Sequence, residues 1–269
     1  MYPKQTDLQP EDAVRLVDTH CHLDCEPLRS DLPRILASAR RAGVIGFVVP
    51  GVHPDDWGRI TALSREHGGV MTAFGIHPMH ADLAEDSALA ALEKIAATGV
   101  ALGEIGLDPL YSVPLERQER AFRDQLRLAV ALGLPVLVHC RRCFERTLWI
   151  LREEKAGQVG GIMHAFSGSP EMAREFIRLG FCISLSGTVT WQGALRPVRL
   201  AREIPLENLV LETDAPDLTP QAHRGQPNQP AWMWEVLLEV ADIRGMLVAD
   251  VAHAVLNNTQ RIFGDIPAQ

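Results

Sequence analysis

Two histidines separated by one residue end an apolar run near the start of the chain. His20 and His22 follow the run Leu16-Val17-Asp18-Thr19, and the two-residue repeat of a strand places both imidazoles on one face. Two imidazoles on one face form a good pair of ligands for a single metal ion. The spacing therefore predicts metal chemistry close to this strand.

Further side chains of ligand type end apolar runs later in the chain. They are Glu104, His139, His164 and Asp214. A lone histidine after an apolar strand is more often a hydrogen-bonded core residue. Burying all these polar groups unpaired, for structure alone, would cost several kcal/mol. Together with His20 and His22 they predict one shared metal centre, provided that the fold brings the ends of these runs together.

The pattern of the chain predicts such a fold. Short apolar, β-branched runs alternate with segments of helical spacing, as in β/α units around a parallel sheet. The predicted strands are Arg15–Thr19, Ile45–Pro50, Val70–Ile76, Val100–Ile105, Leu134–His139, Gly161–Ala165, Phe181–Ser186 and Leu209–Thr213. Eight units in 269 residues are typical of an α/β fold of the (β/α)₈ TIM-barrel type, which we expect to form a single domain over residues 1–269. The carboxyl ends of barrel strands meet at one mouth, where such enzymes have their active sites.

Helix signals occur between these runs. Phe122, Leu126 and Ala129 lie on one helix face, and Gly133 provides a stop. Ser169 is expected to cap a helix that ends at Gly180. The last two helices are predicted over Ala231–Ile243 and Val248–Phe263. The segment Thr219–Pro230 has three prolines and few apolar residues, which predicts a long loop with a functional role.

Composition excludes several classes of protein. The chain is 46% hydrophobic and 22% charged, with five cysteines, which is unlike a disordered or disulfide-dense chain. It has no apolar run long enough to span a membrane, and residues 1–14 are polar, so we expect no cleaved signal and a cytoplasmic protein with reduced thiols. A net charge of −8 argues against a large basic surface that grips duplex DNA, but not against a phosphodiester held by metal ions.

The donor set indicates two ions rather than one. Four histidines and two carboxylates exceed the needs of one catalytic ion with an open position for water. Glu104, on a central strand, is predicted to bridge two divalent ions. Asp214 is predicted to bind one ion and to accept a proton from its water. Imidazole and carboxylate ligands suit Zn, Mn, Fe, Co or Ni better than Mg, without singling out one of them.

Several polar residues near these runs are candidates for substrate contact. His77 ends the third strand and is predicted to contact substrate or phosphate, the alternative being a core histidine. Arg224, in the loop after the last strand, is predicted to clamp an anionic substrate, unless it is an ordinary solvated arginine. Asn228 shares that loop and is assigned to substrate binding with it. Asp108 is predicted to orient a ligand histidine.

The pair Cys140 and Cys143 has the spacing of redox and zinc motifs. Strand alternation points Cys140 away from the mouth, and the chain has no second pair to complete a zinc site, so a packing role is favoured. Cys21 and Cys182 are interpreted as small buried residues. The neighbouring arginines are either solvated or receive a nucleic-acid backbone; they are Arg141, Arg142 and Arg146.

These motifs, in this order, resemble those of the TatD family of metal-dependent deoxyribonucleases. The matching segments are Asp18–Asp24, Gly75–Pro78, Gly103–Asp108, Pro135–His139, His164–Gly168, Leu211–Pro216 and Arg224–Pro230. The segments around Asp217 and Asn228 are similar to the family's YjjV-like branch. The resemblance implies a TIM barrel of the amidohydrolase superfamily with two divalent metal ions. It assigns His20, His22, Glu104 and Asp214 to one ion, and Glu104, His139 and His164 to the other.

The resemblance also implies an activity, namely hydrolysis of DNA from the 3′ ends of single strands. Pro109-Leu110-Tyr111 departs from the aromatic residues that many members carry there, so the loop after the fourth strand is expected to differ. Two alternatives remain: a hydrolase of a small ester, lactone or amide, because loops set the substrate, and a metal-binding interaction protein without turnover. A monomer is favoured, with single-stranded DNA or DNA ends as its partner.

Overall fold

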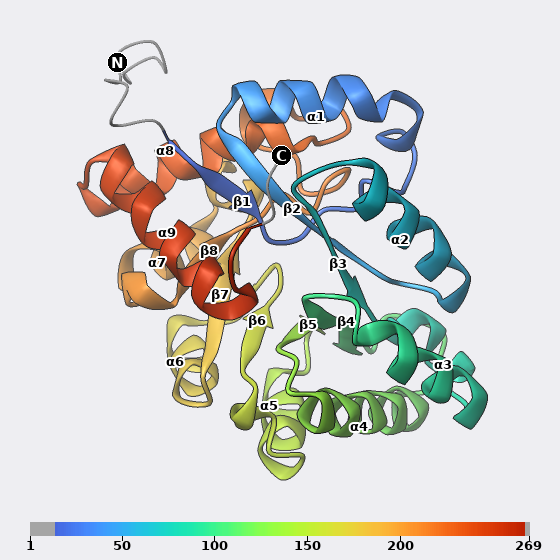
Figure 1. The fold of residues 1–269 in the computed structure, drawn as a ribbon. Helices are drawn as coiled ribbons and strands as arrows, with labels where there is room; N and C mark the ends of the chain where they lie inside the picture. The colour runs from blue at the N-terminus through green and yellow to red at the C-terminus, as the bar shows by residue number, and fades with distance from the viewer. Residues whose placement is uncertain (1–13, 267–269) are drawn as a thin grey trace.

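Eight parallel strands form the centre of the molecule, in the order β1 to β8 along the sheet (Figure 1). The computed structural model describes residues 14–266, so the polar start on which the signal expectation rests lies almost entirely outside the described residues. The strands are β1 Leu16–Asp18, β2 Val44–Pro50, β3 Val70–Phe74, β4 Ala101–Leu107, β5 Val136–Cys140, β6 Gly161–Met163, β7 Phe181–Leu185 and β8 Leu209–Leu211. The predicted TIM barrel is confirmed.

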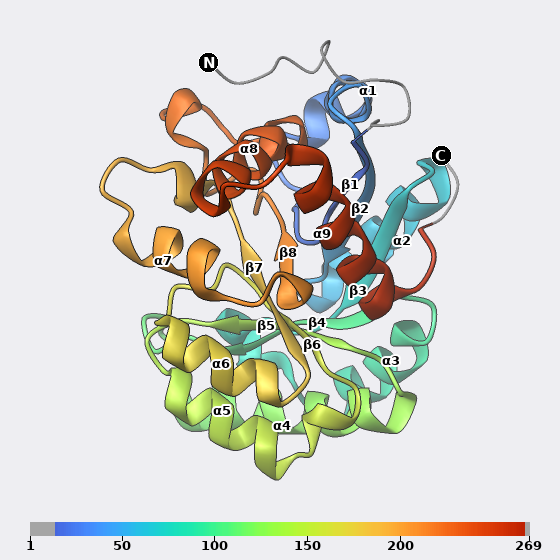
Figure 2. The ribbon, with the colours of Figure 1, turned by 90° about the vertical axis from the view of Figure 1, so that its left-hand side faces the viewer.

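Helices surround this barrel (Figures 1 and 2). They are α1 Leu32–Arg41, α2 Trp57–Glu66, α3 Asp86–Ala96, α4 Leu115–Leu132, α5 Phe144–Glu153, α6 Pro170–Arg178, α7 Leu195–Glu203, α8 Met233–Arg244 and α9 Val248–Phe263. None of the helices among residues 14–266 has the length and apolarity that crossing a membrane requires. The predicted stops and caps are confirmed, since Gly133 adopts a left-handed conformation after α4 and the Ser169 side chain accepts from the Met172 N–H.

Every predicted strand differs from the observed one by one or two residues at one end or both, and two boundaries differ for a visible reason. The helix expected from Ala231 begins as α8 at Met233, because a short 3-10 turn over Pro230–Trp232 precedes it. Strand β4 continues to Leu107 instead of ending at Ile105, so Glu104 lies inside the strand. The register with β5 shifts between Leu102 and Ile105, and this irregularity lets the strand continue past the glutamate.

One glycine permits the close pairing of β4 with β5 beyond the irregularity. Gly106 is paired with His139 and has φ +147°. A Cβ atom at this position would lie 1.9 Å from the carbonyl oxygen of His139. Any larger residue would therefore push β5 away from β4 and displace His139, which lies in β5.

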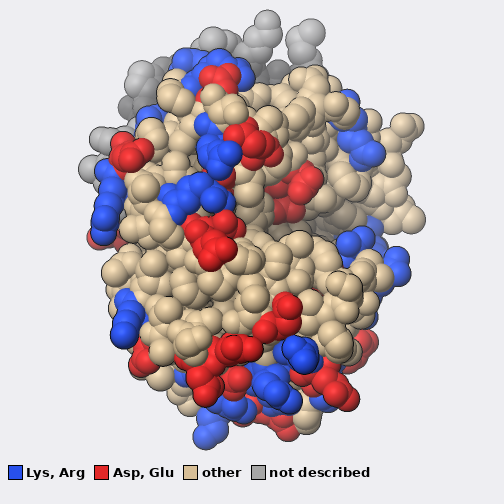
Figure 3. All heavy atoms as spheres, turned by 90° about the vertical axis from the view of Figure 1, so that its right-hand side faces the viewer, with Lys and Arg blue, Asp and Glu red and all other residues tan. Residues whose placement is uncertain are grey.

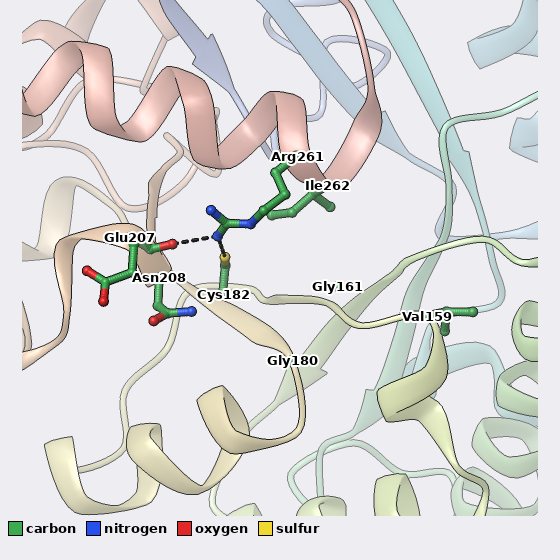
Figure 4. Close-up of a pocket in the computed structure, with 8 residues that line it drawn as sticks. All are labelled: Val159, Gly161, Gly180, Cys182, Glu207, Asn208, Arg261 and Ile262. Atoms are coloured by element: carbon green, nitrogen blue, oxygen red, sulfur yellow. Dashed lines mark hydrogen bonds between the residues drawn. The ribbon is translucent and has the colours of Figure 1, made fainter.

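Apolar side chains fill the barrel and separate its two ends. The interior cluster is Val17, Val48, Met71, Ala73, Ala101, Leu137, Ile162, Cys182 and Val210. Leu256 and Phe263 of α9, with Ile266, pack against it, and Figure 2 shows α9 lying across this end. A cavity of about 360 Å³ lies here, where Arg261 approaches the Cys182 Sγ to 3.5 Å (Figure 4). Cys182 is buried, as predicted.

The first and last strands meet at the other end, through residues just beyond them. Within the described residues, backbone hydrogen bonds of the sheet join each strand to the next, from β1 and β2 through to β7 and β8. The Thr19 N–H donates to the Leu211 carbonyl at 3.2 Å, and the Asp214 N–H donates to the His20 carbonyl at 2.9 Å. The barrel is therefore joined at the mouth, next to the residues with ligand-type side chains.

Candidate metal centre

Glu104 lies at the centre of the histidine cluster. Its Oε1 atom is 2.8 Å from His139 Nδ1, 3.5 Å from His77 Nε2 and 3.7 Å from His164 Nε2. Its Oε2 atom is 3.3 Å from His20 Nε2. Burial by itself raises the pKa of a carboxyl, but His77, His20 and His164 hold the pKa of Glu104 well below its usual range. The side chain is thus a buried carboxylate surrounded by imidazoles.

Asp214 lies on the opposite side of this cluster. Its Oδ1 atom is 3.5 Å from His22 Nε2, 3.6 Å from His164 Nε2 and 3.7 Å from His20 Nε2. Its backbone adopts φ +57°, a region that non-glycine residues occupy at a cost and that is frequent at functional sites. The structure thus brings all the sequence-predicted donors together, because each histidine among them lies within 3.7 Å of Glu104 or Asp214.

The donor atoms fall into groups small enough to surround an ion. Those of His20, His22 and Asp214 lie within 4.8 Å of one another, and so do those of His77, Glu104 and His139. The first group agrees with the expected ligands of one ion. In the second, His77 stands where the sequence predicted His164.

His20 provides the clearest sign that this cluster fits a cation. The side chain is 1% exposed, and neither ring nitrogen has a hydrogen-bond partner. Burial and the neighbouring His164 lower the pKa of His20, which favours the neutral ring that binds metals. Its ring stacks on that of His164 with centroids 3.5 Å apart. Unpaired buried nitrogens are costly in a core, whereas a divalent ion would satisfy them.

His164 and His139 carry pKa values raised by carboxylates. Burial opposes protonation of His164, but Glu212, Asp214 and Glu104 outweigh it and raise its pKa to about 10. Burial likewise opposes protonation of His139, and Asp108 and Glu104 raise its pKa to about 9. The carboxylates around these rings therefore favour positive charge at this place, which a divalent cation would also supply.

Two further carboxylates orient the rings from behind. Glu212 is fully buried, and its Oε1 atom lies 3.0 Å from His164 Nδ1 and accepts from the Ala165 N–H at 2.8 Å. Asp108 Oδ2 lies 3.1 Å from His139 Nε2, in agreement with its predicted orienting role. Sequence reasoning missed Glu212, although a charged residue directly after the apolar strand β8 was a signal that could have found it.

Asp18 joins the first strand of the barrel to the segment that follows the last strand, next to these ligands. Its Oδ1 atom accepts from the Thr213 N–H at 2.9 Å and from the His20 N–H at 3.3 Å, and Oδ2 accepts from the Thr213 hydroxyl at 2.5 Å. Burial raises the pKa of Asp18 to about 7, although these hydrogen bonds oppose the rise. Asp18 therefore fixes the backbone that carries His20 and the backbone that leads to Asp214.

The tautomer of His77 argues against metal ligation. Its Nδ1 accepts from the Met79 N–H at 3.2 Å, so the proton of the neutral ring is on Nε2. That nitrogen faces Glu104 at 3.5 Å as a donor and has no lone pair for an ion. Burial lowers the pKa of His77, which keeps the ring neutral. The Nε2–H therefore faces the Glu104 carboxylate, and His77 is not among the residues that line the cavity described next, so its contact with a substrate oxygen stays a prediction.

A cavity of about 700 Å³ opens over these residues. His139, His164 and Asp214 line its base, and its walls include Tyr111, Arg141, Phe166, Trp191, Arg196 and Asp217. On the face shown in Figure 3, Lys and Arg side chains lie in separate groups among Asp and Glu, and uncharged residues occupy the middle. The charged side chains on this face are therefore of mixed sign.

The residues predicted for substrate binding in the loop after β8 have other contacts. The Arg224 guanidinium lies 4.5 Å from the centre of the Trp191 ring, and Arg224 does not line the cavity. Asn228 is fully buried, and its amide donates to the carbonyls of Thr213 and Asp217 at 2.9 and 2.8 Å. The assignment of Asn228 to substrate is therefore corrected, because its amide group holds the loop in place.

The cysteine pair stays outside the metal cluster. Cys140 Sγ is buried 3.2 Å from the Thr147 hydroxyl of α5, and Cys143 Sγ lies 3.4 Å from the Leu107 carbonyl. All five cysteines are free thiols. Of the arginines near this pair, Arg141 lines the cavity, whereas Arg146 pairs with Glu119.

Known proteins share this sequence and this architecture. A family model described as TatD related DNase matches residues 17–264. The uncharacterized metal-dependent hydrolase YjjV of Escherichia coli (strain K12) is 36% identical over 254 residues, which cover 93% of this chain and 98% of that protein. Its crystal structure has a TM-score of 0.88 at 35% identity and covers 94% of this chain and 99% of that chain. Human deoxyribonuclease TATDN3 is 32% identical over 267 residues, covering 93% of this chain and 95% of that protein.

Proposed function

Because the chain belongs to the family of TatD-related DNases, we propose that this metal-dependent hydrolase cleaves phosphodiester bonds of single-stranded DNA from the 3′ end. One observation carries the metal dependence, namely the buried His20 ring without a hydrogen-bond partner, between two carboxylates. The name of the human relative, a deoxyribonuclease, supports DNA as the substrate.

The ligand-type side chains of the cluster are assigned to two ions. His20, His22 and Asp214 would hold one ion and His139 and His164 the other, with the Glu104 carboxylate between them. When bound, two divalent ions supply an activated water and positive charge beside the phosphate.

Three side chains are assigned to the proton of the attacking water and to the negative charge on the phosphate. Burial raises the pKa of Asp214, but His164 and His22 outweigh it and lower that pKa, so the carboxylate is ionised, as the group that accepts the proton of the attacking water must be. The Nε2–H of His77, which lies 3.5 Å from Glu104, would be shared with a phosphate oxygen and stabilise the charge that grows there. Arg141, in the cavity wall, is a second donor for the phosphate.

The test pairs metal analysis with digestion of end-labelled single-stranded DNA by purified protein. We expect about two divalent ions per chain and a 5′-labelled ladder that shortens from the 3′ end. Asp214→Asn is the control for a contaminating nuclease. Metal at full occupancy with tight DNA binding but no cleavage under any divalent ion would replace the proposal with a binding protein.

A small substrate is the second candidate, and the shape of the site favours it. A cavity of about 700 Å³ is in the range of small-molecule sites, and the net charge of −8 does not attract long polyanions. A panel of small phosphodiesters, lactones and amides, assayed beside DNA with the same ions, separates the two candidates by their kcat/KM values.

A further inference from the structure

We propose that the indole of Trp191 is a platform on which a base of the substrate strand stacks, and that Arg224 is the positioning residue that holds this ring. The inference rests on the proposed function, because it assigns a nucleotide-binding wall to the same cavity. Trp191 follows the short 3-10 helix Gly187–Thr190 after β7. It lines the cavity whose base is formed by His139, His164 and Asp214, so a ligand at those residues lies within reach of the ring.

The ring is held in one orientation by the loop after β8. Its Nε1–H donates to the Thr219 carbonyl at 2.8 Å. The Gln221 N–H donates to the Thr190 hydroxyl at 2.8 Å, and the Gln192 N–H donates to the Gln221 side chain at 3.0 Å. These bonds on both sides of Trp191 fix the backbone as well as the indole, so little conformational entropy remains to be lost when a base stacks on it.

Arg224 packs over the indole of Trp191. Its guanidinium lies 4.5 Å from the ring centre, a distance at which a cation is attracted to an indole face. Trp191 lines the cavity and Arg224 does not, so the cation acts on a ligand there through the ring. The predicted clamp on the substrate is thus replaced by an indirect role.

The surrounding wall suits a nucleotide rather than a simple acyl or sugar ligand. Two cations, Arg141 and Arg196, line the same cavity as the indole. Proteins that bind single strands without sequence preference combine aromatic rings for the bases with cations for the backbone. The acidic residues Asp214 and Asp217 also line the cavity, and they disfavour a phosphate beside them unless a cation intervenes. The base is therefore assigned to the Trp191 wall and the phosphate to the metal centre.

The experiment compares intact single-stranded oligonucleotides with ones that lack a single base, placed at each 3′-terminal position in turn. For the wild type, removal of the base at one position should lower kcat/KM about tenfold, the size expected for loss of one base–aromatic stack. Trp191→Ala should lose about tenfold on the intact strand and nothing more when that base is missing. Trp191→Phe keeps a ring and should retain most of the activity, although it loses the bond to Thr219.

The chain offers a matched control in Trp149. This indole is 42% exposed on α5 and also contacts an arginine, Arg146, at 4.2 Å, but it lies outside the cavity. Trp149→Ala should leave both kcat/KM values unchanged. Arg224→Ala should weaken the dependence on the base, and Arg224→Lys should partly restore it, a pattern that general loosening of the loop would not produce.

Equilibrium binding of the same oligonucleotides separates this inference from the proposed function. If the wild type binds the intact strand about tenfold more tightly than the abasic strand through Trp191, yet does not cleave it, the stacking platform stands and the nuclease proposal fails. If DNA is cleaved but the losses caused by Trp191→Ala and by base removal multiply, the platform is refuted and the nuclease proposal stands.

Discussion

Glu212 and His164 form a buried pair in which the histidine Nδ1 lies 3.0 Å from one carboxylate oxygen and 3.1 Å from the other. This contact leaves the Nε2 of His164 directed toward Glu104 and Asp214. A carboxylate behind a ligand imidazole fixes its tautomer and increases its basicity. The pair is therefore expected to govern how tightly the centre holds metal.

Replacing Glu212 by Gln should weaken the binding of one of the two ions. Loss of such a partner typically costs about 10- to 100-fold in metal affinity, while the amide can still accept from the Ala165 N–H. Calorimetric titration of chelator-treated protein with Zn²⁺ or Mn²⁺ measures the change. Unaltered affinity for both ions would show that Glu212 serves only to complete the core.

Glu104→Ala should impair both ion sites at once, because the carboxylate lies next to His20 on one side and His139 on the other. Metal analysis after dialysis should find well below one ion per chain, and hydrolysis should fall to background. A variant that retained its metal and its activity would contradict the bridging position. Circular dichroism serves as the check that the barrel still forms.

Asp214→Asn should reduce turnover far more than it reduces stability. Loss of a general base costs about 100- to 10,000-fold in rate. The unfolding free energy of the metal-free protein should change by about 1 kcal/mol or less. Steady-state kinetics and urea unfolding give the two numbers. Parallel losses in both would assign Asp214 a structural role.

Thr213→Val should destabilise the closure of the barrel. It removes the hydroxyl that donates to the fully buried Asp18, and a buried acceptor left short of a partner costs about 1–3 kcal/mol. Urea unfolding of the metal-free protein is the measurement. Thr98→Val is the matched control, since it also removes a donating hydroxyl, but one that donates to the Ile95 carbonyl at an exposed site, and it should cost about 0.5 kcal/mol or less.

Removal of metal with a chelator should lower the melting temperature and abolish hydrolysis, and added divalent ion should restore both. An ion at a hundred times its Kd stabilises the folded state by about 2.7 kcal/mol. For a chain of this length the stabilisation corresponds to a shift of roughly 5 °C or more. Differential scanning calorimetry with and without added ion measures it, and equal melting temperatures would argue against a metal in this cluster.

The sequence predicted the donor set because each of those residues interrupts an apolar run. Such interruptions are visible without coordinates, and parallel strands in a barrel leave few places for them to go. The position of Glu104 inside β4 was not predictable, because it depends on a shift in register against β5 that has no local sequence signal.

Loop residues were harder to assign than strand residues. Asn228 and Arg224 lie in one loop, yet the first is buried among carbonyls and the second lies over Trp191. Their types suit both substrate binding and loop packing, and only the tertiary contacts decide between these roles. Trp191 drew no attention in the sequence because its function depends on a cavity formed by distant segments.

The seam between β1 and β8 has a consequence for how the protein is made. Asp18 near the beginning of the chain is bonded to Thr213, and the peptides of His20 and Asp214 are bonded to each other. During translation, a nascent chain released before this last strand emerges lacks Asp214 and has nothing to join to its first strand. Prematurely terminated products should therefore be catalytically inert, whatever metal the cell supplies.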